Sequence, residues 1–159
     1  MSARSQSTRG FTLVEILIVV VILGILAAIV IPQFTNASES AKAASLSSQL
    51  QTIRSQLELS QIQHQGTYPD LVTASPAWTQ LVTKTAPVSA YTASAATNAV
   101  GPYLQQAPVN PFETSSSVAT AAAAGVGWVY TNTTGSVKAC ISAAKQTALS
   151  FPTTDVATY

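Results

Sequence analysis

The dominant pattern along the chain is an uninterrupted apolar run near the N-terminus. Between Ile16 and Ile31 no side chain is polar or charged, and with Phe11 to Glu15 in front the segment has 21 residues. About 20 helical residues cross the ~30 Å hydrocarbon core of a bilayer. The run predicts a membrane-spanning helix. Arg4 and Arg9 precede it without an acidic neighbour, which predicts a cytoplasmic N-terminus and an outward-facing remainder.

An amphipathic pattern follows the apolar run. No Gly or Pro occurs between Phe34 and Gln63. Apolar residues recur there at helical spacing: Leu46, Leu50, Ile53 and Leu57. We expect one helix from Phe11 to His64 whose second half packs under a C-terminal domain. His64, at the helix end, is interpreted as a capping residue and not as a ligand. Arg54 and Glu58, four residues apart, are expected to pair.

The C-terminal part predicts a hairpin. Aromatic and β-branched residues in 127–131 and 136–141 flank a Gly-containing turn at 132–135. One face is expected to lie against the long helix: Val129, Val137, Ala139 and Ile141. Trp128 and Tyr130 are interpreted as core residues or subunit contacts, and not as a ligand platform.

Three segments before the hairpin differ in character. Ser75 and Pro76 fit an N-cap and a first helical residue, which predicts a short helix through Val82. Residues 85–100 are rich in Ala, Ser and Thr without periodicity and predict an irregular connector. Residues 101–112 combine prolines with apolar side chains and predict an ordered, packed loop.

Charge and motifs exclude several functions. The formal net charge is +1 and the seven Lys and Arg are scattered, so we expect no nucleic-acid binding. The single cysteine, Cys140, excludes an intrachain disulfide and is interpreted as a core residue. We expect no enzyme and no catalytic residue, although a spatial pairing of Cys140 with His64 stays open. Asn132 begins a glycosylation triplet, a pattern that is also common by chance.

Glu15 stands at the start of the apolar run. A carboxylate in a membrane helix costs about 2.5 to 3.5 kcal/mol on insertion scales, so it usually marks a function or has a partner. A secretory signal would have a shorter apolar region and a better cleavage site than Ala27-Ala28. A plain anchor, in which Glu15 reaches headgroup water, is the simpler alternative.

The sequence Arg9-Gly10-Phe11-Thr12-Leu13-Val14-Glu15, followed by the apolar run and Pro32, resembles the class III signal of type IV pilins and type II secretion pseudopilins. The resemblance implies cleavage between Gly10 and Phe11 and N-methylation of Phe11, which leaves 159 − 10 = 149 residues. It also implies that Glu15 neutralises the terminal amine of a neighbouring subunit during assembly. Buried charges are tolerated only when they are paired.

A pilin-like α+β fold follows from the same resemblance. Its parts would be a leader at 1–10, a transmembrane assembly half-helix at 11–33, an amphipathic half-helix at 34–64 and a periplasmic or extracellular domain at 65–159. Gly24 and Pro32 are expected to break the helix, with a kink or local melting just before the proline.

Partners and location are also implied by the resemblance. It predicts a homo-oligomeric helical filament, a prepilin peptidase and methyltransferase, an inner-membrane assembly platform, minor pseudopilins, and membrane lipid before assembly. The chain would be single-pass in the bacterial inner membrane, with its C-terminal domain in the periplasm. Residues 101–112 resemble a segment of the major pseudopilins, with Asn110 and Phe112 in place of Asp and Trp.

That segment favours a pseudopilus subunit that drives protein export across the outer membrane. A type IV pilus subunit for adhesion, motility or DNA uptake is the alternative. A membrane-tethered binding module and a membrane-anchored hydrolase with a polar pocket are rivals from other classes. Major pseudopilins also carry a calcium site in a C-terminal loop. Calcium takes about 6 to 8 oxygen ligands, and only Asp155 is acidic after Glu113, so we expect no cofactor and no metal ligand.

Overall fold

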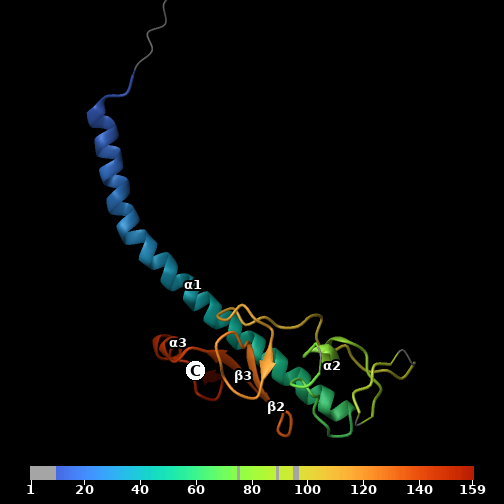
Figure 1. Cartoon of the computed structure of the whole chain (residues 1–159). Coiled ribbons are helices and arrows are strands. Elements are labelled where there is room, and N and C mark those ends of the chain that lie inside the picture. The colour runs from blue at the N-terminus through green and yellow to red at the C-terminus, as the bar shows by residue number, and fades with distance from the viewer. Residues whose placement is uncertain (1–9, 75, 89, 95–96) are drawn as a thin grey trace, which may run out of the picture. The chain divides into compact units, whose positions relative to one another are not determined.

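The computed structural model describes residues 10–74, 76–88, 90–94 and 97–159. The chain forms two compact units that meet between Glu39 and Ser40, and each is described by itself. The elements in chain order are α1 Leu13–Gln63, α2 Thr79–Val82, β1 Val118–Ala119, β2 Trp128–Thr131, β3 Ser136–Ile141, α3 Ala143–Leu149 and β4 Val156–Thr158 (Figure 1). One long helix followed by a small mixed sheet confirms the predicted pilin-like α+β arrangement.

Helix α1 has 51 residues and lies close to its predicted limits. Gly24 and Pro32 lie inside it, and the residues on both sides of each are helical. A proline inside a helix removes its own backbone donor and crowds the carbonyl of the preceding turn, whereas the other residues of α1 keep their donors. The helix thus runs without a gap through both residues, and a kink or local melting there stays a prediction.

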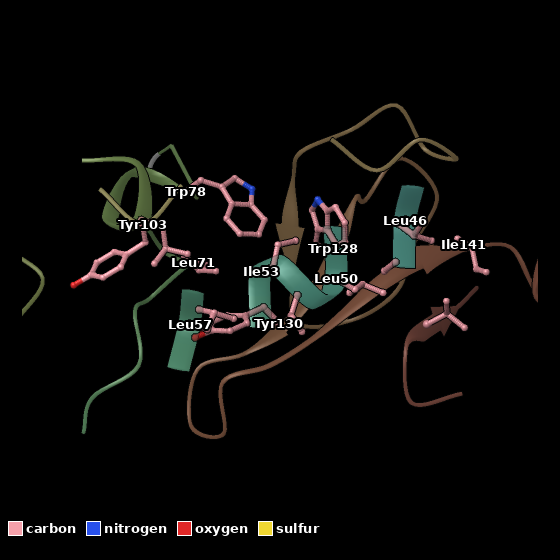
Figure 2. Packing of buried hydrophobic residues seen from close by; sticks show 14 residues of the cluster. Leu46, Leu50, Ile53, Leu57, Leu71, Trp78, Tyr103, Trp128, Tyr130 and Ile141 are labelled. Atoms are coloured by element: carbon pink, nitrogen blue, oxygen red, sulfur yellow. The ribbon is translucent and has the colours of Figure 1, made fainter. Parts of the chain in front are cut away.

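The predicted apolar stripe of α1 is the centre of the core. Its four residues are at most 1% exposed: Leu46, Leu50, Ile53 and Leu57. They form one cluster with buried side chains from the loops and the sheet, including Leu71, Trp78 and Tyr103 (Figure 2). Each fully buried aliphatic side chain contributes about 1.5 to 3 kcal/mol relative to an exposed one. The stripe thus fixes the sheet against the second half of α1.

The sheet has the order β1-β2-β3-β4, with an antiparallel central pair and a parallel strand at each edge. Trp128 pairs with Ala139, and Tyr130 pairs with Val137, so these side chains share the core face. Val129 pairs with Lys138 and is only partly buried. The prediction that Val129 lies on the core face was wrong, because alternate residues of a strand point to opposite faces.

Another prediction needed correction. The short helix begins at Thr79, later than Pro76 suggested, and Ser75 lies outside the described residues. The described residues of the 85–100 connector form no helix or strand, as predicted, and Thr85 makes isolated backbone bridges with Ala93 and Val100.

Arg54 does not pair with Glu58 in this structure. Its Nη1 donates to Asp155 Oδ1 at 2.8 Å and its Nη2 donates to the carbonyl of Val137 at 3.2 Å. A partner that also offers nearby carbonyls satisfies more of the guanidinium's donors than a neighbour on the same helix. Arg54 therefore links α1 to the segment around Asp155 and does not form the predicted pair on the helix surface.

Candidate processing and assembly site

The start of α1 is fixed by a side-chain cap. The backbone N–H of Glu15 donates to Oγ1 of Thr12 at 3.2 Å, and the N–H of Ile16 donates to the carbonyl of Thr12 at 3.3 Å. A threonine that bonds the third residue of a helix is an N-cap, and an acid at that third position completes the capping-box sequence. Sequence reasoning missed this role of Thr12, although the Thr-x-x-Glu spacing signals it.

The predicted cleavage junction is exposed and lies just before the capped helix. Gly10 is exposed, and Phe11 is 80% exposed. A Cβ added to Gly10 would meet no atom within 4 Å. The folded chain itself therefore makes no demand for glycine at this position. The remainder of the predicted leader, with Arg4 and Arg9, lies outside the described residues.

Glu15 is an exposed carboxylate in the first turn of an apolar helix. Within the described part of the chain no cationic side chain forms an ion pair with it. In lipid or in a dry helix bundle such a charge is costly until an opposite charge approaches. The arrangement therefore leaves Glu15 available for a partner on another molecule.

The surface of α1 from Ile16 to Ile31 is apolar around its whole circumference. Successive side chains from Ile16 to Leu23 are each about half exposed, between 48% and 60%. Consecutive helical residues point about 100° apart, so no face of this segment is polar. By length and composition α1 is able to cross a membrane. This half of the helix must be covered by lipid or by other protein chains.

His64 and Cys140 do not form a catalytic pair. The buried His64 ring has Nδ1 2.9 Å from the carbonyl of Ser60 and Nε2 2.9 Å from Oγ1 of Thr85. The buried Cys140 thiol contacts the carbonyl of Ala123 at 3.4 Å, and burial raises the pKa of this thiol. The two side chains have separate partners. His64 lies directly after the last residue of α1 and contacts one of its final carbonyls, as a capping residue would.

The side chain of Asn132, the first residue of the glycosylation triplet, is hydrogen-bonded to another part of the domain. Nδ2 of Asn132, the atom that a glycan would occupy, donates to Oδ1 of Asp70 at 2.9 Å. Hydrogen bonds from Thr73 and Asn132 lower the pKa of Asp70 to about 2. The charged carboxylate therefore holds Asn132 in place.

The residues after Asn110 do not fit a calcium ion. Within the described residues no group of three Asp, Glu, His or Cys side chains comes together. Both oxygens of Glu113 accept hydrogen bonds, and Asp155 is paired with Arg54. Calcium needs about 6 to 8 oxygens, commonly with several carboxylates. The carboxylates in this part of the chain are too few for a calcium site, and those present already have hydrogen-bond or ion-pair partners.

Comparison with known proteins places the similarity in the N-terminal third. Residues 5–31 match the family described as the prokaryotic N-terminal methylation motif. The type II secretion system core protein G of Pseudomonas aeruginosa is 46% identical over 59 residues, which cover 37% of this chain and 40% of the relative. That of Klebsiella michiganensis is 41% identical over 56 residues, covering 35% and 39%.

A pilus protein is similar over about the same share of this chain. The type IV narrow pilus major component PilA5 of Thermus thermophilus is 38% identical over 58 residues, covering 36% of this chain and 50% of the relative. Each match thus spans half or less of the relative's length. No solved structure matches the chain significantly. The comparisons support the predicted methylation motif and similarity to pseudopilins.

Proposed function

We propose that this chain is a structural subunit of a type II secretion pseudopilus. The observation that carries the proposal is the exposed Gly10–Phe11 junction beside a capped helix that is apolar on all sides and carries Glu15 in its first turn. The match to the methylation motif covers this segment. Polymerisation through α1 would bury its apolar surface and drive protein export across the outer membrane.

Processing is the first step of the proposed function. A prepilin peptidase removes residues 1–10 and a methyltransferase modifies the new amine of Phe11. Cleavage removes Arg4 and Arg9 and creates one positive charge at Phe11. The first residues of the mature chain then carry one positive and one negative charge in an apolar surrounding, where only a pair of opposite charges is tolerated.

Glu15 sets the register of assembly in this proposal. Its carboxylate binds the terminal amine of a neighbouring subunit, and that contact fixes the axial step between subunits. Gly24 and Pro32 are proposed as places where α1 adjusts when helices pack together. The C-terminal domain faces the periplasm before assembly and forms the filament surface afterwards.

Partners follow from the same proposal. They are lipid of the inner membrane before assembly, further copies of the chain in a helical filament, minor pseudopilins, and an inner-membrane assembly platform. No enzymatic role is proposed, because the similar proteins are named as components of a secretion system and of a pilus.

The second candidate is a type IV pilus subunit for adhesion, motility or DNA uptake. The similarity to a pilus major component over half of its length favours it. The resemblance of residues 101–112 to a segment of the major pseudopilins favours the pseudopilus instead, and this segment is packed, with Tyr103 and Asn110 buried.

Mass spectrometry of the mature chain and a secretion assay test the proposal together. We expect a protein that begins at N-methylated Phe11 and whose deletion leaves secreted enzymes in the periplasm. A mature protein that begins at Met1 would contradict the class. Normal export combined with lost surface filaments would favour the pilus subunit.

A further inference from the structure

The side chain of Glu113 joins two distant parts of the C-terminal unit. Its Oε2 accepts a hydrogen bond from the backbone N–H of Gly125 at 3.1 Å. Its Oε1 accepts one from the hydroxyl of Tyr159 at 2.7 Å. One carboxylate therefore reaches both the far end of the segment 113–127 and the last residue of the chain.

Several other polar groups of segment 113–127 also have hydrogen-bond partners, some inside the segment and some outside it. The hydroxyl of Ser117 donates to the carbonyl of Gly125 at 3.1 Å and lies 2.9 Å from the hydroxyl of Ser115. Where the segment meets β2, Nδ2 of the buried Asn110 donates to the carbonyl of Gly127 at 2.8 Å. These oxygens and amides already have partners, and a cation would have to displace them.

Tyr159 is held at its backbone as well as at its hydroxyl. It follows the edge strand β4, and its carbonyl accepts a hydrogen bond from the N–H of Ala143 at 3.4 Å. Donation to the Glu113 carboxylate raises the pKa of Tyr159. The tyrosine thereby connects segment 113–127 to the edge of the sheet.

We propose that Glu113, through Gly125 and Tyr159, closes segment 113–127 without a metal, so that this chain needs no counterpart of the calcium site that the resemblance implies for a C-terminal loop. The carboxylate cross-links the segment with two hydrogen bonds that need no metal. Stability of the C-terminal unit is then independent of calcium and depends on Glu113 and Tyr159 together. The inference goes beyond the proposed filament and holds whether or not the chain polymerises.

Thermal unfolding of the full-length chain in detergent micelles tests this inference. The measurement is made with about 1 mM calcium, the weak end of extracellular calcium sites, and again with a chelator. We expect the same unfolding midpoint in both conditions. Glu113→Gln and Tyr159→Phe should each lower it by about 2 to 4 °C in both conditions, the size expected for one hydrogen bond in a chain of this length.

A double variant and two control variants complete the experiment. The double variant should lose less than the sum of the two single variants, because both alter the contact between Glu113 and Tyr159. Glu58→Gln and Tyr68→Phe are the controls, since neither side chain has a hydrogen bond to the described residues, and both should leave the midpoint unchanged. A midpoint raised by calcium in the wild type, or unaltered by both Glu113→Gln and Tyr159→Phe, would overturn the proposal.

Discussion

The imidazole of His64 stacks on the phenol ring of Tyr91, with ring centroids 3.9 Å apart and planes inclined by 13°. The pair joins the end of α1 to the 85–100 connector. The hydroxyl of Tyr91 extends the contact, because it lies 2.8 Å from Oγ of Ser60 and donates to the carbonyl of Thr67 at 2.9 Å. A segment without sequence periodicity is thus anchored by one aromatic side chain.

We expect His64→Ala to destabilise the C-terminal unit by about 2 to 4 kcal/mol, because it leaves a cavity and unpaired polar groups. Tyr91→Phe keeps the stack and should cost about 1 kcal/mol for its lost hydrogen bonds. Urea unfolding in mild detergent, followed by the fluorescence of the buried Trp78 and Trp128, measures both changes. Equal losses in the two variants would contradict a role for the stack.

Alkaline pH should weaken the same region. Burial raises the pKa of Tyr91 to about 12, and burial also raises the pKa of Tyr130. An unfolded tyrosine ionises near pH 10, so between pH 10 and 12 the unfolded state binds fewer protons than the folded state. Stability therefore falls as the pH rises through this window. Tyr91→Phe should make the fall shallower, which urea unfolding at several pH values between about 9 and 12 would show.

Gly10→Val should block processing without disturbing the folded chain. A Cβ at Gly10 meets no atom within 4 Å, so we expect valine to be tolerated by the described residues. Any loss must then arise in the peptidase. We expect the full-length precursor to accumulate in the membrane, which immunoblotting detects as the larger form. Normal maturation of Gly10→Val would show that the cut is made elsewhere.

Glu15→Ala should leave processing intact and abolish filaments. The cap of α1 uses the backbone N–H of Glu15, so it survives this substitution. Thr12→Ala is the matched control, because it removes the cap at a cost of about 1 kcal/mol but keeps the carboxylate. We expect Thr12→Ala to assemble. Electron microscopy that shows normal filaments from Glu15→Ala would remove the register role.

Asn110→Asp should be strongly destabilising at neutral pH. Nδ2 of Asn110 donates to the carbonyls of Gly127 and Cys140 at 2.8 and 2.7 Å, and a carboxylate there would face two acceptors. We expect a loss of about 3 kcal/mol at neutral pH, which shrinks as the pH falls toward about 4, because the protonated acid is able to donate to these carbonyls. Asn98→Asp, on an exposed residue, should be neutral in the same urea titration.

The predictable parts of the fold are those in which apolar residues recur at a regular spacing along the sequence. The stripe from Leu46 to Leu57 and the hairpin around Gly135 both repeat with the geometry of their element, and both were confirmed. β1 and β4 were missed, because strands of two and three residues are too short to show alternation. Their existence depends on β2 and β3, which supply the pairing partners.

Contacts between distant residues were the least predictable. Arg54 was expected to bind its neighbour on the helix, yet Asp155 lies 101 positions away in sequence and offers a better-matched site. The roles of Glu113 and Tyr91 also depend on contacts between residues that are far apart in the sequence. At the candidate site, by contrast, the residues lie close together in sequence. Sequence reasoning singled out Gly10, Phe11 and Glu15, whose roles stay predictions, and it missed the Thr12 cap.

The burial of Cys140 has a practical consequence. Its thiol is inaccessible and its raised pKa keeps it protonated near neutral pH, whereas alkylating reagents need an exposed thiolate. We therefore expect the native chain not to react with maleimides. A single cysteine introduced at an exposed residue such as Ile62 can be labelled or cross-linked selectively, without first replacing the natural one.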